Sequence, residues 1–345
     1  MLLEVKNLSV DFKVGKQTLR AVNNVSFSLG EKDSLGLVGE SGCGKSTTAF
    51  ALMRLLAGNG KIAEGQILLN GTDLVTASYD EIRKIRWKEI SIIFQNAMTA
   101  LNPVQKIGDQ IINALREHEN ITRKEAIERA EYLFERVGIA KSRLMQYPHE
   151  FSGGMKQRAV IALALICSPK ILIADEPTTA LDVVAQRQVI ELLAGLQDEF
   201  NISIVMISHD ISAVAEACHN IAVMYGGEIM EQGKSKDVLI TNNHPYTHAL
   251  VGSFPSLHKP LSTLAQIPGS APNLADMPKV SVTRFCSSSF VLQSFSDFSG
   301  SATISRMVIL GSRESYGSWK IICSFFRKET ICFLPLIVEI SVPSM

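Results

Sequence analysis

Apolar and polar residues alternate over positions 2 to 29, in the stretches LLEVKNLSV and AVNNVSFSL. A period of two residues is typical of β-strands that bury one face, and Gly15 between the stretches favours a turn. The segment GQILLNGTDL at 65 to 74 has the same character. The pattern therefore predicts two β-hairpins near the start of the chain.

Four other stretches are apolar almost throughout: SLGLV at 34 to 38, ILIAD at 171 to 175, ISIVMIS at 202 to 208 and NIAVMY at 220 to 225. Segments long enough for helices separate them. Apolar strands that alternate with helices indicate a parallel sheet that is covered on both faces. The predicted fold class is therefore α/β.

Two further regions have their own patterns. Residues 79 to 164 show helical periodicity with many charges, as in ITRKEAIERAEYLFERVGI, and are broken by a loop at 95 to 104, so we expect a helical subdomain. From 281 to 345 serine is frequent, charge is sparse and neither period persists. We assign no domain there, although the segment is too apolar for a well-solvated tail.

The composition limits the possible partners. Lys plus Arg and Asp plus Glu each number 34, so the formal net charge is zero and no long-range attraction to nucleic acid or anionic lipid is expected. The six cysteines form no CxxC pair, which favours a reducing compartment. The N-terminus lacks the pattern of a secretory signal, and polar residues interrupt the longest apolar run, at 159 to 174. We expect a chain that is neither exported nor membrane-spanning.

The most specific motif is GESGCGKS at 39 to 46, which matches GxxxxGK[ST] between a predicted strand and a predicted helix. In such a loop the backbone N–H groups surround phosphate oxygens, the lysine reaches the β- and γ-phosphates, and the serine hydroxyl ligates Mg²⁺. The plainer alternative is an ordinary glycine-rich turn. The expected nucleotide-binding residues of the loop are Gly39, Glu40, Ser41, Gly42, Cys43, Gly44, Lys45, Ser46 and Thr47.

A second candidate is the pair Asp175 and Glu176, at the end of an apolar stretch. Asp175 is expected to hold Mg²⁺ through water, and Glu176 to polarise the attacking water as a general base. Acidic residues are common at strand ends, so the pair alone indicates little. Downstream of a phosphate loop, it predicts hydrolysis of a nucleoside triphosphate.

Between these motifs lies FSGGMKQR at 151 to 158, and with it the chain resembles the ABC ATPases over about residues 2 to 278. The resemblance implies a P-loop ABC ATPase cassette with an N-terminal antiparallel β subdomain, a RecA-like parallel-sheet core and a helical subdomain. It also implies a head-to-tail dimer in which Ser152, Gly153 and Gly154 close over the γ-phosphate of ATP on the partner. Ser152 is in addition a good N-cap for the following helix, and SGG alone is a common flexible turn.

The resemblance gives four more residues a role, and each has a plainer alternative. Phe12 would stack on adenine, or be a hairpin core residue. Gln95 would act with the catalytic residues, contact Mg²⁺ and sense the membrane subunit, or be a loop amide. Asp182 would lie in the dimer-contact loop, or cap a helix. His209 would be the switch histidine on the γ-phosphate, or a satisfied strand-end histidine.

Finer segments narrow the resemblance to one branch. IFQNAMTALNP at 93 to 103, NHPYTHAL at 243 to 250 and IPGSAPNL at 267 to 274 are similar to the ATPases of dipeptide and oligopeptide importers, a branch that includes nickel uptake systems. The ATPase of such a system does not touch the cargo, so the substrate is inferred from the branch alone.

The resemblance implies an ATPase domain at 1 to 240 and an importer-type extension at 241 to 279, followed by an atypical tail at 280 to 345. The branch commonly continues with a cysteine cluster, in some members an iron–sulfur site, whereas only Cys286 lies near, so no iron–sulfur cluster is predicted. The tail is either poorly ordered or an out-of-frame reading, because codons for Val-Ser-Val at 280 to 282 can contain codons for Cys-Arg one base over.

The implied function is ATP binding and hydrolysis, with ATP and Mg²⁺ as cofactors, that powers an importer of dipeptides or oligopeptides. The implied subunit is peripheral, on the cytoplasmic face of the cell membrane. Its partners would be a second ABC ATPase subunit, identical or not, two transmembrane permease subunits and, indirectly, an extracytoplasmic solute-binding protein, but no nucleic acid. The alternatives are the ATPase of a nickel or other small-solute importer, and an assembly-defective copy with an aberrant tail.

Overall fold

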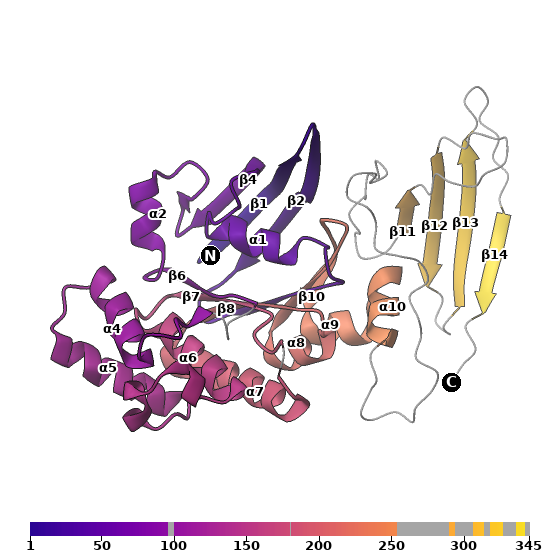
Figure 1. Cartoon of the computed structure of the whole chain (residues 1–345). Coiled ribbons are helices and arrows are strands. Elements are labelled where there is room, and N and C mark those ends of the chain that lie inside the picture. Colours follow the sequence, from indigo (N-terminus) through magenta and orange to yellow (C-terminus); the bar gives the residue numbers. More distant parts are fainter. Residues whose placement is uncertain are drawn as a thin grey trace. The chain divides into compact units, whose positions relative to one another are not determined.

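The computed structural model describes residues 1–95, 100–179 and 181–253, together with the backbone of four strands between residues 290 and 341. The chain divides into two units, Met1–Ala275 and Asp276–Met345. The first unit contains two sheets with the helices around them, and the second contains one sheet (Figure 1).

An antiparallel sheet with the strand order β2-β1-β4-β5 forms one layer of the first unit. Its first two strands are the predicted hairpin, in which Leu3 lies opposite Leu29 and the turn contains Gly15 with a positive φ. The second predicted hairpin is β4 and β5. The bounds are β1 (Leu3–Val14), β2 (Gln17–Leu29), β4 (Gly60–Leu69) and β5 (Thr72–Asp73).

The core sheet has the order β10-β9-β3-β8-β7-β6. Its strands run parallel except for β10, which is antiparallel to β9. Every residue of β3, β7 and β8 is buried, as their apolar sequences predict. The bounds are β3 (Ser34–Val38), β6 (Ile90–Ile93), β7 (Ile171–Asp175), β8 (Ser203–Ser208), β9 (Asn220–Tyr225) and β10 (Glu228–Lys234).

Alternate residues of the core sheet enter two different hydrophobic clusters. Leu37 and Ile173 pack with the antiparallel sheet and α1, whereas Val38 and Leu172 pack with α6, α7 and α8. The core sheet therefore lies between these two layers, which are visible above and below it in Figure 1. The helices are α1 (Lys45–Leu52), α6 (Gly153–Leu165), α7 (Val183–Phe200) and α8 (Ile211–Ala217).

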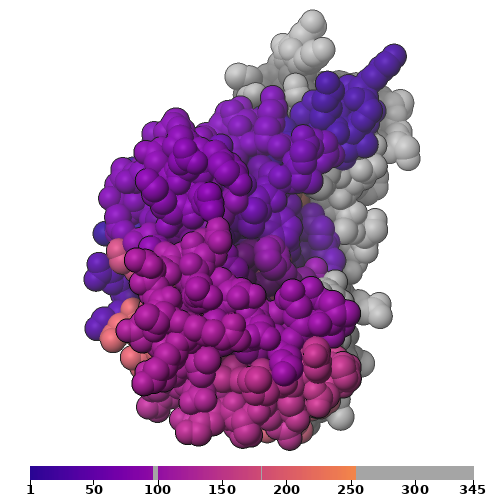
Figure 2. Space-filling view, turned by 60° about the vertical axis from the view of Figure 1, so that its left-hand side comes forward, coloured from indigo at the N-terminus to yellow at the C-terminus, as the bar shows by residue number. Residues whose placement is uncertain are grey.

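The helical segment surrounds the fully buried Phe134. It comprises α4 (Ile107–His118), α5 (Arg123–Arg136), η1 (Lys141–Met145) and η2 (Pro148–Glu150), and it continues into α6. In the space-filling view it forms the lower, magenta part of the first unit, below the indigo and purple N-terminal part (Figure 2). The predicted helical range of 79 to 164 was too wide, because it contains β6 as well as α2 (Tyr79–Ile85), and β6 pairs with β7 in the core sheet.

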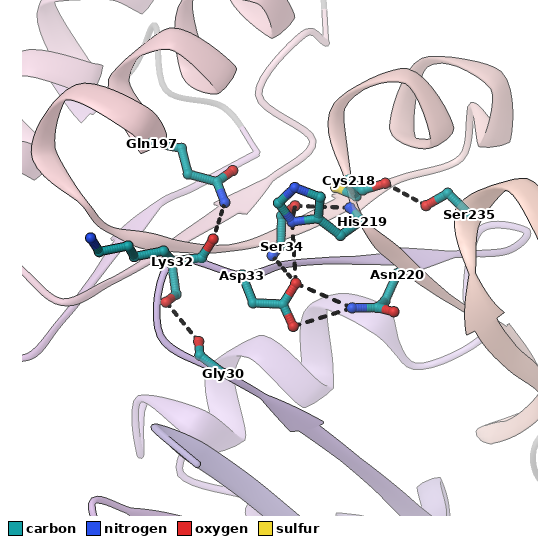
Figure 3. Close-up of polar contacts among 10 residues, drawn as sticks. Gly30, Lys32, Asp33, Ser34, Gln197, Cys218, His219, Asn220 and Ser235 are labelled. Atoms are coloured by element: carbon teal, nitrogen blue, oxygen red, sulfur yellow. Dashed lines mark hydrogen bonds and ion pairs between the residues drawn. The ribbon is translucent and has the colours of Figure 1, made fainter.

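A polar cluster fixes the amino ends of β3 and β9 (Figure 3). The Asp33 carboxylate accepts hydrogen bonds from Asn220 Nδ2 at 3.2 Å and from the Ser34 N–H at 2.8 Å, and it lies 3.2 Å from His219 Nδ1. The Ser34 hydroxyl accepts the His219 N–H at 2.9 Å. Helix α9 (Ser235–Ile240) joins this cluster through the Ser235 hydroxyl, which donates to the Cys218 carbonyl. The cluster ties together strand starts at the end of the sheet opposite to the phosphate loop.

The second unit contains an antiparallel sheet with the order β11-β12-β13-β14. The sequence predicted no persistent strand pattern there, because segments such as RMVILGSR and SWKIICSFF do not alternate cleanly between apolar and polar residues. They are nevertheless rich in the β-branched and aromatic residues that favour strands. The bounds are β11 (Phe290–Gln293), β12 (Arg306–Arg313), β13 (Ser318–Phe326) and β14 (Leu336–Ser341).

Gly36, in the middle of β3, allows α8 to approach the core sheet. A Cβ at this position would lie 1.9 Å from Cγ1 of Val214, a buried and stiff β-branched side chain. We expect Gly36→Ala to lower the free energy of unfolding by about 1–3 kcal/mol, measured by denaturant titration. The control is Gly58→Ala, because a Cβ there meets open space. The added change Val214→Ala should recover part of the loss, and a Gly36→Ala chain as stable as the wild type would contradict this packing.

Candidate nucleotide site

The phosphate loop connects β3 to α1, as predicted. Two of its glycines lie where a side chain has no room: a Cβ on Gly39 would be 2.1 Å from the Met224 carbonyl, and one on Gly44 would be 2.6 Å from the Ala21 carbonyl. Gly44 also has a φ of 100°, a conformation that favours glycine. The loop therefore packs closely between strands β9 and β2.

Lys45 is buried and its ammonium lies against its own loop. Nζ donates to the carbonyls of Gly39 at 2.7 Å and Glu40 at 2.8 Å. It also lies 3.6 Å from Cys43 Sγ, and burial raises the pKa of the Cys43 thiol, which therefore stays protonated near neutral pH. Cys43 is thus a buried, protonated residue of the loop, and Lys45 places its ammonium inside the loop.

Asp175, at the carboxyl end of β7, is bonded to the first turn of α1. The Ser46 hydroxyl donates to Asp175 Oδ1 at 3.0 Å. The other oxygen, Oδ2, is buried and has no hydrogen-bond partner within the described part of the chain. Burial raises the pKa of Asp175. A buried carboxylate oxygen without a partner is costly unless something else, such as a cation, binds to it.

Glu176 is held by donors from two other segments. Its Oε2 accepts hydrogen bonds from Gln95 Nε2 at 2.7 Å and from the Thr179 hydroxyl at 2.9 Å. Its backbone has a φ of 46°, which is uncommon for a residue with a side chain, and its N–H donates to the Ile207 carbonyl at 2.9 Å. Strain of this kind is typical of functional sites, where the surrounding structure fixes the side-chain direction.

His209 follows β8 and approaches the same carboxylate. Its Nδ1 lies 3.6 Å from Glu176 Oε1, and 63% of its side chain is exposed. Burial alone would raise the pKa of Glu176, but the hydrogen bonds from Thr179 and Gln95, together with the nearby His209 and Lys45, lower it overall. Glu176 is therefore ionised at neutral pH. The structure brings together Lys45, Ser46, Gln95, Asp175, Glu176 and His209, all predicted from the sequence.

The SGG segment begins α6 away from the phosphate loop of its own chain. Ser152 is the predicted N-cap, since its hydroxyl accepts the Met155 N–H at 3.3 Å, and Gly153 and Gly154 form the first turn. Among the residues that the structure describes, no hydrogen bond joins these three residues to the phosphate loop. Their amides at the positive end of a helix suit an anion supplied from elsewhere.

Asp182 and Phe12 have the plainer of the two roles considered for each, helix cap and hairpin residue. These roles do not exclude the roles implied by the resemblance. The Asp182 carboxylate accepts the Ala185 N–H at 2.9 Å and caps α7, and the exposed Val183 follows it. Phe12 is part of β1 and packs closely on Gly60, where a Cβ would lie 2.7 Å from the ring. Contacts of Asp182 with a second subunit and of Phe12 with adenine stay predictions.

Comparison with known proteins decides the family. Residues 22–179 match the family model described as ABC transporter. The oligopeptide transport ATP-binding protein of Escherichia coli is 47% identical over 280 residues, which cover 81% of this chain and 83% of that protein. The dipeptide transport ATP-binding protein of Lactococcus lactis is 47% identical over 281 residues, with 81% and 80% covered. The chain belongs to the ATP-binding proteins of ABC transporters.

The ABC ATPase fold predicted from the sequence is confirmed as well. A dimeric ATP-binding cassette, solved in a post-hydrolysis state with ADP and Pi, aligns with a TM-score of 0.61 at 27% identity and covers 68% of this chain and 98% of that one. Residues 230–286 match the model described as Oligopeptide/dipeptide transporter, C-terminal region, so the predicted branch is also confirmed.

Thr179 was not identified from the sequence as a hydrogen-bond partner of the Glu176 carboxylate. The sequence did contain a signal, because a threonine three residues after Glu176 can donate its hydroxyl to that carboxylate. Pairs of adjacent threonines are too common, however, for the sequence alone to identify one of them as functional. As for membrane spans, none of the helices in the described ranges is both long and apolar enough to cross a bilayer.

Proposed function

We propose that this ABC ATPase hydrolyses ATP with Mg²⁺ to power the import of dipeptides or oligopeptides. The observation that carries the proposal is the Glu176 carboxylate, which is ionised, held by Gln95 and Thr179, and adjacent in the chain to Asp175. Asp175 is bonded in turn to Ser46 of the phosphate loop. A base is thus fixed beside the place where the phosphates of ATP would lie.

The residues present fit a magnesium ion. Mg²⁺ prefers hard oxygen ligands, and Asp175 Oδ2 is a buried carboxylate oxygen without a hydrogen-bond partner among the described residues. We assign Ser46, Asp175 and Gln95 to the ion. When bound, it would neutralise charge that develops on the phosphates.

The chain's own residues supply the remaining functions. Backbone amides within the loop from Gly39 to Thr47 surround the phosphates, and Lys45 exchanges its two carbonyl partners for phosphate oxygens. Glu176 accepts the proton of the water that attacks the γ-phosphate. His209, which is exposed beside Glu176, contacts that phosphate, and Phe12 stacks on adenine.

The functional unit in this proposal is a dimer of ATPase subunits. Ser152, Gly153 and Gly154 bind the γ-phosphate held by the partner subunit, and within the described ranges they form no hydrogen bond with the chain's own phosphate loop. Asp182 and the exposed Val183 that follows it lie in the contact loop. Closure of the dimer completes both sites, and hydrolysis reopens it.

The subunit is proposed to lie on the cytoplasmic face of the cell membrane, bound to two transmembrane permease subunits that receive their substrate from an extracytoplasmic binding protein. The relatives named above are transport proteins for oligopeptides and dipeptides, which supports a peptide cargo. To test it, the gene would be deleted in its own organism, and uptake of a labelled tripeptide and of nickel ions measured. Wild type, but not Glu176→Gln, should restore peptide uptake. Loss of nickel uptake alone would favour the small-solute alternative.

We propose that the tail from 280 to 345 is atypical for this branch of importers. The match to the family model of the extension ends at residue 286, which supports this proposal. The proposal that the full chain assembles predicts that it hydrolyses ATP as fast as a chain ending after Pro278, and co-purifies with permease subunits. If only the shortened chain does so, the tail is a lesion. Sequencing the gene through codon 280 tests the out-of-frame hypothesis separately.

A further inference from the structure

The extension after β10 places a tyrosine against the phosphate loop. Helix α10 (Pro245–Ser253) carries Tyr246, whose hydroxyl accepts a hydrogen bond from the backbone N–H of Glu40 at 3.3 Å. The two residues are 206 positions apart in the chain. The Tyr246 ring also packs on Tyr225 at the end of β9, with ring centroids 4.6 Å apart. The extension therefore contacts the loop that binds phosphate.

The start of α10 is fixed to the core sheet. The Glu231 carboxylate of β10 accepts the backbone N–H of Asn243 at 2.8 Å and that of His244 at 3.2 Å. His244 Nδ1 accepts the Tyr246 N–H at 3.2 Å, and burial lowers the pKa of the His244 ring, which favours the neutral form whose Nδ1 can accept. These bonds limit the movement of the tyrosine relative to the sheet.

The phosphate loop is held from outside at two points. At one, the Gly227 N–H donates to the Cys43 carbonyl at 3.1 Å. At the other, Tyr246 accepts the N–H of Glu40, near the beginning of the loop. Burial raises the pKa of Tyr246, so its hydroxyl keeps the proton near neutral pH. A loop fixed at both points loses less conformational freedom when it closes around phosphate.

We propose that Tyr246 is a positioning residue for ATP binding. By accepting the Glu40 N–H, it holds the beginning of the phosphate loop in the conformation in which the following amides face the phosphates. The inference rests on the proposed ATP site and extends it, because it gives the C-terminal extension a part in nucleotide affinity. Tyr246 itself does not touch the reacting atoms in this account.

The test is Tyr246→Phe, which removes the hydroxyl and keeps the ring on Tyr225. We expect the Kd of ATP, measured by calorimetry on the full chain with Mg²⁺, to rise about three- to tenfold, the worth of one neutral hydrogen bond. KM for ATP should rise by the same factor. The turnover number kcat should stay within about twofold, because the hydroxyl is not near the reacting water.

Two tyrosines provide matched controls. Tyr225→Phe removes the hydroxyl of the ring partner, which has no hydrogen bond among the described residues. Tyr132→Phe removes a hydroxyl that is hydrogen-bonded to Glu199 at 3.1 Å in the helical segment. Both variants should bind ATP as the wild type does. Thermal unfolding of all three variants separates a loss of affinity from a loss of folded protein.

The outcomes distinguish this inference from the proposed function. If the wild type neither binds nor hydrolyses ATP, the proposed function fails. If the wild type does both and Tyr246→Phe has an unchanged Kd, the positioning role is overturned. It is also overturned if Tyr246→Phe only lowers kcat and stability together, because a structural role alone predicts that pattern. A raised Kd with kcat and the unfolding temperature unchanged supports it.

Discussion

The Glu176→Gln variant is expected to bind ATP but to hydrolyse it at least about 100-fold more slowly than the wild type, because it lacks the general base. The amide has the shape of the carboxylate, and its oxygen can still accept a hydrogen bond from Thr179 or Gln95. In the wild type these donors lie 2.9 and 2.7 Å from Glu176 Oε2. It cannot take a proton from water. The lowered pKa of Glu176 means that the wild-type group is ionised at neutral pH, so the full effect is visible in steady-state hydrolysis there.

The same variant also tests the dimer. With ATP bound and not consumed, Glu176→Gln should elute from size-exclusion chromatography as a dimer, whereas the wild type returns to the monomer as ATP is used. Glu191→Gln is the control, since Glu191 is an exposed carboxylate on α7 that pairs with Arg187. A Glu176→Gln chain with near-normal turnover, or one that no longer binds ATP, would contradict the assigned role.

The parts of the site that could be predicted are those whose residues are adjacent in the sequence. The phosphate loop is a contiguous motif after a strand, so its spacing alone identified it. The Asp175–Glu176 pair is also contiguous, but it became informative only together with that loop. Gln95 and His209 reach Glu176 from distant segments, and only the resemblance to ABC ATPases linked them. Tyr246 was part of a segment used to narrow the branch, but no periodicity relates it to Glu40, 206 residues away.

The fold divides in a similar way. Apolar stretches predicted β3, β7, β8 and β9, and alternation predicted the first hairpin. Strand β6 was missed because its four residues, ISII, lie within a charged, helix-like region and gain their place by pairing with β7. The order β10-β9-β3-β8-β7-β6 could not be predicted from periodicity, which tells which face a residue occupies but not which strand lies beside it.

Asp175→Asn is expected to lower ATP turnover by about 100-fold, comparable to the loss of one major electrostatic contact in an active site. In the wild type the Ser46 hydroxyl donates to Asp175 Oδ1 at 3.0 Å. The Asn oxygen can still accept this hydrogen bond, so the contact between β7 and the phosphate loop is kept. The charge on the buried Oδ2 is removed, and with it the proposed magnesium ligand. Hydrolysis titrated with Mg²⁺ at fixed ATP should then require a much higher Mg²⁺ concentration. The exposed Asp198, changed to Asn, is the control.

The pH dependence of magnesium binding distinguishes this role from a structural one. Burial raises the pKa of Asp175 above its ordinary value of 3.8, so the stability that this carboxyl contributes is present below that value and is lost as the pH rises through the raised pKa. Bound Mg²⁺ would offset this loss, because it favours the ionised form. The rise in unfolding temperature caused by Mg²⁺ should therefore be largest at high pH and disappear as the pH falls through the raised pKa. In Asp175→Asn the rise should be small at every pH, and a wild-type response in that variant would show that Asp175 does not hold the ion.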